Sequence, residues 1–484
     1  MKDYILINEL DNVVVALHPL SKGDKVFDVE LKEDIQQGHK VAINDIKKDE
    51  NVIKYGNPIG HATKDIHKGE HVHIHNLKTN LSDIIDYSYT KIKTDLKQRD
   101  PKYFKGYLRS NGKVGIRNSI WIIPTVGCVN GIVENIKRQF ENEDVVAFRH
   151  PYGCSQMGDD QDNTRQFLAN LINHPNAGGV LVVGLGCENS SISEIKKHYP
   201  ENADESRIRY LVCQESSDEI ADGVNLINEL LEITKKDQRC DIPADKLIVG
   251  LKCGGSDGLS GICANPAVGA FSDILCSMGG TTILTEVPEM FGAEQLLMNR
   301  CKNGEVFNKT VKLIDDFKNY FKAHNQTIYE NPSPGNKAGG ISTLEDKSLG
   351  CTQKSGSSVV NDVLMYCETV KEKGLNLLSA PGNDLVASSA LAISGCHMVL
   401  FTTGRGTPFA SPIPTLKISS NTPLFEKKNN WIDFNAGDIA QGAAISTKGE
   451  ELFNLVIDVA NGKKLKSEIS SYQDMAIFKQ GVTL

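Results

Sequence analysis

The sequence predicts an α/β protein in which a small all-β domain precedes α/β domains with mostly parallel sheets. Three observations lead to this prediction. Residues 1–80 hold short apolar runs separated by turn signals such as Lys22-Gly23-Asp24, a pattern typical of a small barrel-like module. Residues 81–105 are polar and rich in lysine and aspartate, as in a linker. From residue 106, strand-like runs, glycine-containing loops and helix-like stretches alternate, which predicts parallel sheets.

The 484 residues are too many for one ordinary core, so we expect several domains. The predicted division is an all-β domain at 1–80, a linker at 81–105, an α/β domain at 106–240 and a C-terminal α/β catalytic domain at 241–484. A polar run at 235–238 marks the second boundary. The stretch 331–340 predicts a long loop, because its prolines and glycines suit neither a helix nor a central strand.

Composition and the N-terminus restrict the class of protein. The net charge of −8 argues against a bulk nucleic-acid binder, which is usually basic. The charged start, Met1-Lys2-Asp3, argues against a signal peptide, and no apolar run approaches the roughly 20 residues that cross a bilayer. We therefore expect a cytoplasmic protein without nucleic-acid or membrane partners. In that compartment the 12 cysteines are expected to be thiols or metal ligands.

Cysteine placement is the clearest sign of chemistry. Five of the 12 cysteines directly follow a glycine, whereas chance would give about one such pair. Several pairs come after an apolar run, so they predict strand-end loops. Glycine lets a backbone turn tightly, and thiolates are soft ligands for iron or zinc. We predict metal binding by Cys154, Cys187, Cys253 and Cys351. A small buried apolar role and a covalent nucleophile are the alternatives.

The run His71-Val72-His73-Ile74-His75 is the sharpest local motif. On a strand, alternate side chains share a face, so three imidazoles would lie on one side. Two of them can reach one metal ion, and His39 can join them. We predict His39 and His73 as metal ligands and His73 and His75 as catalytic groups, while the choice among the imidazoles stays open. The alternative is an exposed polar strand with incidental histidines.

Two further loops follow strand-like runs. The first, Lys252 to Gly258, supplies the hydroxyl of Ser256 and the carboxylate of Asp257 for substrate binding. The second places Arg405 between two glycines, which suits paired hydrogen bonds to a carboxylate. The alternative for Arg405 is a structural turn residue. Glu286 and Glu289 could be bases, metal ligands or helix-start charges.

These motifs together resemble the altronate/galactarate dehydratase family of sugar-acid lyases, and the resemblance runs essentially end to end. Its marks are Gly38-His39-Lys40, the histidine run to Asn76, Thr125-Val126-Gly127-Cys128-Val129-Asn130, Tyr152-Gly153-Cys154, Gly186-Cys187-Glu188-Asn189, Cys253 to Gly261, Glu286-Val287-Pro288-Glu289, Gly350-Cys351-Thr352-Gln353-Lys354 and Gly404-Arg405-Gly406-Thr407-Pro408. It implies a SAF-type (β-clip) first domain and a Rossmann-like part. It also places Glu188 with the metal ligands and Asn130 and Thr407 with the substrate-binding residues.

The resemblance implies dehydration of D-altronate to 2-dehydro-3-deoxy-D-gluconate in hexuronate catabolism, with Fe²⁺ as cofactor and Mn²⁺ also implicated. A metal ion and Arg405 would stabilise the enediolate, and Lys337, Lys354, His73 and His75 are the candidates for base and acid. We expect the N-terminal histidines to close over the strand-end loops. Galactarate is the alternative substrate. An NAD-dependent oxidoreductase, a binding or metal-storage protein and an Fe–S cluster stay open, and a homodimer is the default.

Overall fold

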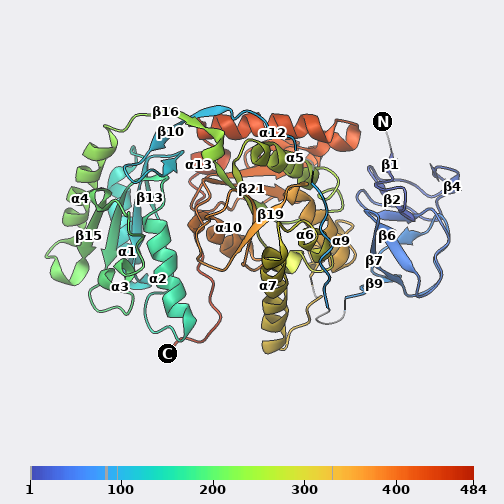
Figure 1. Ribbon diagram of the computed structural model, residues 1–484, viewed down its shortest axis with the longest axis horizontal. Coiled ribbons are helices and arrows are strands. Elements are labelled where there is room, and N and C mark those ends of the chain that lie inside the picture. The colour runs from blue at the N-terminus through green and yellow to red at the C-terminus, as the bar shows by residue number, and fades with distance from the viewer. Residues whose placement is uncertain (1–2, 82–85, 95, 330) are drawn as a thin grey trace.

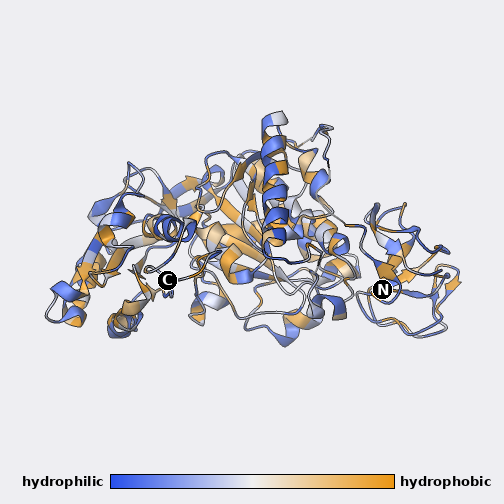
Figure 2. Ribbon diagram, turned by 90° about the horizontal axis from the view of Figure 1, so that it is seen from below, coloured by the Kyte–Doolittle hydropathy of each residue, from blue (hydrophilic) through white to orange (hydrophobic). Residues whose placement is uncertain are grey.

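The computed structural model describes residues 3–81, 86–94, 96–329 and 331–484, which form three folded bodies in a row (Figure 1). The N-terminal module lies beside the C-terminal domain in the centre, and the second domain lies at the opposite end. The predicted α/β class with a small all-β domain is confirmed. Figure 2 shows that the strands of the central domain are mostly hydrophobic. None of the described helices is long and apolar enough to cross a membrane.

The N-terminal module consists of short antiparallel strands. Buried apolar side chains such as Val13, Val52 and Ile59 fill its interior. Frequent turns keep every strand short, as the recurring turn signals predicted. The strands are β1 Tyr4–Ile5, β2 Val13–Ala16, β3 Lys25–Val26, β4 Val29–Glu30, β5 Lys40–Ala42, β6 Asn51–Lys54, β7 Asn57–Ala62, β8 His71–Val72 and β9 Leu77–Lys78.

The second domain is a parallel sheet in the order β13-β12-β14-β15 with helices on both faces. Along β12, Trp121 packs on the α2 side, whereas Ile120 packs on the side of α1 and α4. This alternation follows from the two-residue period of a strand. The elements are β12 Ser119–Pro124, α1 Asn130–Lys137, β13 Val145–Ala147, α2 Asp159–Ile172, β14 Ala177–Gly184, α3 Ile192–Lys196, β15 Ile208–Val212 and α4 Glu219–Thr234.

The C-terminal domain is a seven-stranded parallel sheet in the order β19-β20-β18-β17-β21-β22-β23, a Rossmann-like arrangement. Helices α5 and α12 cover one face and α10 covers the other. The strands are β17 Ile248–Cys253, β18 Thr281–Leu284, β19 Val360–Leu364, β20 Gly374–Leu378, β21 Met398–Thr403, β22 Thr415–Ser419 and β23 Phe434–Asn435. The helices are α5 Ala264–Ser277, α6 Glu294–Met298, α7 Gly304–Ala323, α8 Pro334–Ala338, α9 Leu344–Cys351, α10 Asp384–Ile393, α11 Thr422–Lys427, α12 Ile445–Ala460 and α13 Lys466–Ile469.

The strand order reverses between β17 and β21. From β17 the chain builds the sheet in one direction through β18, and it later returns to β21 on the other side of β17. In open parallel sheets, ligands bind at the carboxyl ends of the strands that flank such a switch point. The loops after Cys253 and Thr403 therefore mark the place to examine for a site.

The prediction that 331–340 is a long loop without a helix was wrong. Pro334 to Ala338 form the short helix α8, which Ser333 caps through its side chain. Proline is compatible with a first helical turn because the amide it lacks has no partner there. The predicted linker 81–105 includes residues 82–85 and 95, which lie outside the described residues. Its last part is strand β10 (Tyr103–Leu108), which pairs with β11 (Val114–Gly115) and β16 (Cys240–Pro243).

One buried carboxylate links the N-terminal module to the C-terminal domain. Asp346 in α9 accepts hydrogen bonds from Lys40 Nζ (2.8 Å) and Lys54 Nζ (2.9 Å), and all three side chains are buried. Burial opposes ionisation, but the two ammonium groups hold the pKa of Asp346 well below its usual range. The backbones also touch, since a Cβ on Gly258 would lie 2.0 Å from the carbonyl oxygen of Gly38.

We expect Asp346→Asn to weaken this junction. The substitution leaves two ammonium groups buried without a counter-charge, which costs about 3 to 5 kcal/mol in the free energy of unfolding. Thermal unfolding and limited proteolysis of the whole chain measure the loss. Asp65→Asn is the matched control, because it removes an exposed ion pair with Lys47 in the same module. Equal destabilisation by both variants would contradict the proposed role of Asp346.

Candidate active site

One carboxylate at the switch point links the loop after β17 to the residues that follow β22. The loop 254–258 follows β17 and the loop 404–407 follows β21. Asp257 lies between them, and both of its carboxylate oxygens accept hydrogen bonds from neighbouring side chains. The donors are the Ser260 hydroxyl (2.8 Å), the Ser420 hydroxyl (2.8 Å) and the Asn421 amide (3.0 Å). Asp257 was predicted to bind substrate, and in the structure its carboxylate joins the loop after β17 to Ser420 and Asn421, which follow β22.

A cluster of buried charges adjoins the end of β17. Lys252 forms an ion pair with Glu286, and Lys354 lies 3.7 Å from the same carboxylate. Lys347 pairs with Glu289 over 2.6 Å. All five side chains are nearly inaccessible to water. Because the dehydration of buried charges is expensive, removing any one partner would leave another charge unsatisfied.

Two cysteines belong to this cluster. Cys253 Sγ lies 3.3 Å from Cys351 Sγ and 2.8 Å from Glu289 Oε2. The hydrogen bond from the Cys351 thiol lowers the pKa of Cys253, with Lys354 and Lys252 acting in the same direction and burial opposing. Ligand atoms of Cys253, Glu289 and Cys351 all lie within 4.8 Å of one another. The group could hold a soft metal ion, but three buried ammonium groups around it disfavour an added cation.

A second cluster of ligand atoms lies in the N-terminal module. His39 Nδ1 is 2.9 Å from His71 Nε2, and the His73 ring centre lies 4.9 Å from that of His39. One nitrogen from each of these three rings lies within 4.8 Å of the others. His75 is exposed, with its ring centre 5.3 Å from that of His71. Only His71 and Val72 belong to β8, and the turn that follows keeps the later imidazoles on the same side.

The surroundings of this cluster favour neutral imidazoles over charged ones. Burial, together with the neighbouring cationic groups, lowers the pKa of His71 and of His73 to about 3, and burial lowers that of His39 as well. Neutral imidazoles keep a lone pair for a metal ion. The Ser342 hydroxyl lies 2.8 Å from His73 Nδ1 and orients that ring, which leaves Nε2 free.

The histidine cluster contacts the C-terminal domain through the segment 338–342, which follows α8. His39 Nε2 lies 3.4 Å from the carbonyl oxygen of Ala338, and Lys40 Nζ donates to that of Gly340 over 2.7 Å. The same segment touches the loop after β17, since the Gly258 amide donates to the Gly339 carbonyl oxygen over 2.7 Å. The histidines and the switch-point loops therefore line one junction between two domains.

Two cations near this junction have no partner among the described residues. Lys337, half-buried in α8, and Arg405, exposed after β21, form neither a side-chain hydrogen bond nor an ion pair there. The Ser256 hydroxyl is buried and also unpaired. A cavity of about 10 Å³ adjoins Ser256 and Lys347. Such a cavity holds at most one water molecule, so a sugar acid requires the junction to open.

Other predicted residues lie elsewhere. Asn130 is the first residue of α1, and Cys154, Cys187 and Glu188 belong to loops of the second domain; the structure does not group them with Cys253 and Cys351. The Thr407 hydroxyl accepts a hydrogen bond from the Phe409 amide over 3.3 Å, in a turn.

The predicted metal ligands omit His71, which the structure places inside the histidine cluster. The alternation of the three histidines identified the shared side but did not decide which rings converge with His39. That choice depends on the pairing of β8 with β5, in which Val41 lies opposite His71.

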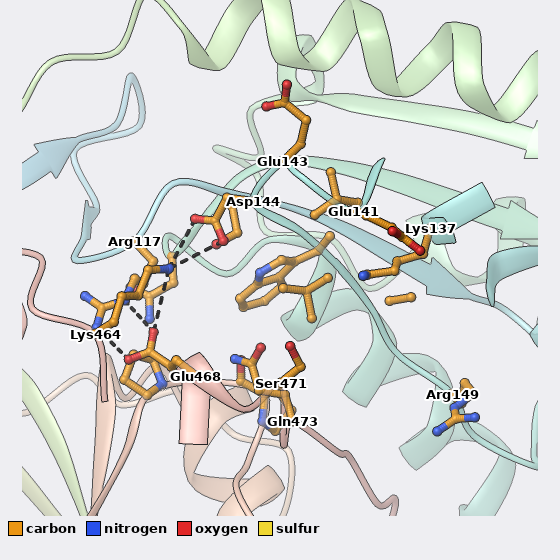
Figure 3. A pocket seen from close by; sticks show the side chains of 18 of the residues that line it. Arg117, Lys137, Glu141, Glu143, Asp144, Arg149, Lys464, Glu468, Ser471 and Gln473 are labelled. Carbon is orange, nitrogen blue, oxygen red and sulfur yellow. Dashed lines mark hydrogen bonds and ion pairs between the residues drawn. The ribbon is translucent and has the colours of Figure 1, made fainter. Parts of the chain in front are cut away.

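A cavity of about 380 Å³ lies between the second domain and the C-terminal segment (Figure 3). Its wall carries Arg117, paired with Glu468 over 2.7 Å, and Lys464, which lies 3.3 Å from Asp144. These charges neutralise one another. Among the described residues, no cysteine or histidine lines this cavity. We therefore place the chemistry at the junction with the N-terminal module.

Three family models match successive parts of the chain. Residues 2–80 match the model of the altronate/galactarate dehydratase SAF domain, residues 106–235 that of the D-galactarate dehydratase/altronate hydrolase second domain, and residues 244–483 that of the D-galactarate/altronate dehydratase C-terminal domain. The chain is 54% identical to altronate dehydratase of Bacillus subtilis over the whole of both chains. It is 53% identical to altronate dehydratase of Escherichia coli, covering 99% of this chain and 100% of the relative. Identity to the L-threo-forming galactarate dehydratase of Escherichia coli is 32%, covering 98% and 96%.

We expect the histidine cluster to bind one divalent ion. Co²⁺ is a useful probe, because cobalt bound by imidazole alone lacks the sulfur-to-metal absorption that thiolates produce. His71→Ala should weaken the sulfur-free component at least about tenfold, since one of three ligands is lost. His67→Ala removes an exposed histidine of the same module and should leave binding unchanged. Unchanged cobalt binding by His71→Ala would show that the cluster is not a metal site.

Proposed function

The chain belongs to the altronate/galactarate dehydratase family, and from this premise we propose that it is a hydro-lyase of hexuronate catabolism. The proposed reaction converts D-altronate into 2-dehydro-3-deoxy-D-gluconate and water. The higher identity to the two altronate dehydratases than to the galactarate dehydratase favours altronate as substrate. Galactarate is the second candidate on the same grounds.

The observation that supports this proposal best is that the histidine cluster and two unpaired cations lie at the same domain junction, next to the switch point. An aldonate carries a carboxylate next to a hydroxyl group. Its dehydration requires positive charge near the carboxylate and proton transfer at C2 and at the C3 hydroxyl. Arg405 and Lys337 provide unpaired cations. The histidine cluster lies against the segment that follows α8, the helix of Lys337.

His39, His71 and His73 fit a divalent iron or manganese ion. They offer three neutral nitrogen atoms within 4.8 Å of one another, and other positions around the ion stay open for a substrate. When bound, such an ion would act as a Lewis acid on the carboxylate and stabilise the negative charge that develops there. The Cys253, Glu289 and Cys351 group fits a cation less well, because Lys347 already neutralises Glu289.

Residues of the chain bind the substrate carboxylate and transfer the two protons. In our proposal the Arg405 guanidinium binds the substrate carboxylate through paired hydrogen bonds and fixes its orientation. The exposed His75 imidazole accepts the proton from C2. The Lys337 ammonium donates a proton to the C3 hydroxyl, which leaves as water. Closure of the histidine module over the loops would exclude bulk water and strengthen these electrostatic contacts.

Lys354 has a different role in this proposal. It was predicted as a base or acid, but its side chain is buried and its ammonium lies 3.7 Å from Glu286. Neighbouring Cys253, Cys351 and Glu286 raise its pKa although burial opposes them, so it stays protonated. We propose Lys354 as a positioning residue that stabilises the end of β17.

Anaerobic turnover tests the function. Metal-stripped full-length protein is given D-altronate with Fe²⁺, with Mn²⁺ or without metal, and formation of a 2-keto acid is followed. We expect metal-dependent product and a higher kcat/KM for altronate than for galactarate. Product from galactarate alone would assign that substrate instead. A change in NADH absorbance would indicate an oxidoreductase, and binding without consumption would indicate a binding protein.

Substitution of Arg405 tests the binding of the carboxylate. Arg405→Ala should lower kcat/KM for altronate about 100-fold, because a charged hydrogen-bonded pair is lost, and Arg405→Lys should recover only part of the activity. Arg149→Ala is the matched control, because Arg149 is also an exposed arginine but lies in the second domain at the cavity of Figure 3. Equal kinetics of Arg405→Ala and the control would remove Arg405 from the site.

A further inference from the structure

Each strand of the second-domain sheet leads into a loop that carries a cysteine. Cys128 follows β12, Cys154 follows β13, Cys187 follows β14 and Cys213 follows β15. The carboxyl ends of parallel strands lie at one edge of a sheet, so these loops are neighbours. The first three cysteines are exposed and Cys213 is half-buried. The proposed dehydratase site uses none of them.

The three loops with exposed cysteines are in direct contact. The Gly127 amide donates over 2.9 Å to the carbonyl oxygen two residues before Cys154, which joins this loop to that of Cys128. The side-chain oxygen of Asn189 lies 3.2 Å from Cys154 Sγ, which joins it to the loop of Cys187. These contacts place three loops from different strand ends side by side, and the cysteine of each loop is exposed.

The glycines before these cysteines make the close contact possible. A Cβ on Gly153 would lie 2.1 Å from the carbonyl oxygen of Thr125, and one on Gly127 would lie 3.0 Å from that of His150. Gly153 also has φ +104°. Larger residues there would push the loops apart. The excess of Gly-Cys pairs in the sequence thus has a structural reason at this edge of the sheet.

Glu188, predicted as a metal ligand, holds these loops in place. One of its oxygens accepts hydrogen bonds from the Thr125 hydroxyl (2.5 Å) and the Leu185 amide (3.2 Å), and the other accepts from the Gly186 amide (2.7 Å). The carboxylate therefore ties the loop after β12 to the loop after β14, which leaves the thiols as the ligand atoms.

The spacing of the thiols decides what they can hold. Within the described chain, Cys128, Cys154 and Cys187 do not form a group whose sulfur atoms all lie within 4.8 Å of one another. A single tetrahedral ion with metal–sulfur bonds of about 2.3 Å needs sulfur atoms about 4 Å apart. Three thiolates from three separate loops can instead each bind a different iron of one cluster.

We propose that Cys128, Cys154 and Cys187 bind a [4Fe–4S] cluster in the second domain. Each thiolate is the ligand of one iron. In this proposal the fourth iron has no protein thiolate, since Cys213, the fourth cysteine at this edge, is half-buried, and an oxygen ligand would complete it. This site is separate from the histidine cluster, so the chain has two places for iron of different chemistry.

Anaerobic reconstitution of the full-length chain with equal amounts of Fe²⁺ and Fe³⁺ and with sulfide tests the proposal. The wild type should gain about four iron and four sulfide ions per chain, broad absorption near 400 nm and an electron paramagnetic resonance signal after one-electron reduction. Cys128→Ser, Cys154→Ser and Cys187→Ser should each lose most of the absorption and sulfide. Cys240→Ser is the matched control, because Cys240 is exposed on β16 outside the three loops and should keep the full cluster.

Three results would overturn the proposal: no acid-labile sulfide in the wild type, iron bound by the thiols without sulfide, or equal cluster content in Cys154→Ser and Cys240→Ser. Thermal unfolding of each variant shows that the thiol, and not the fold, was lost. His71→Ala removes the single-metal site and should retain the cluster. Failure of the dehydratase proposal and failure of the cluster proposal are therefore distinguishable.

Discussion

The ion pairs that Asp346 forms with Lys40 and Lys54 are the interaction on which the candidate active site depends. Three charges are buried where a small β module meets a large α/β domain, and none is satisfied without the others. If the two parts were separated, Lys40 and Lys54 of the module and Asp346 of the domain would lose their counter-charges. Their pairing fixes where the histidine cluster sits, because Lys40 directly follows His39 in the chain. Glycine contacts at Gly38 and Gly258 then allow the backbones to approach closely.

Parallel sheets supply the second constraint. Every strand end of such a sheet lies at the same edge, so residues far apart in the sequence meet there without any local signal. In the C-terminal domain this brings Cys253 and Arg405 to one switch point, with buried lysines and glutamates as counter-charges. In the second domain it brings three exposed cysteines together. The two edges differ in charge and in exposure, which explains why we assign imidazole and cation chemistry to one and thiolate chemistry to the other.

The fold and parts of the site were predictable from local patterns. Strand and helix alternation gives parallel sheets wherever short connections link them, and turn signals give short antiparallel strands. The alternating histidines predicted a group of imidazoles in the N-terminal module, because alternate residues of a strand share a side. The helix at Pro334 escaped prediction because proline excludes a helix interior but not a first turn. The sequence could not show that Glu188 and Asp257 accept hydrogen bonds from other loops, because those loops lie elsewhere in the chain.

The sequence by itself determined the α/β class with a small all-β first domain and the residue types available for chemistry, since these follow from periodicity, composition and spacing. Only the tertiary structure decided which of those residues share a site. It placed His71 with His39, separated Cys154 and Cys187 from Cys253 and Cys351, and buried Lys354 beside Glu286. The reason is physical: burial, charge pairing and metal geometry depend on distances between strand ends and domains, and no local pattern encodes those distances.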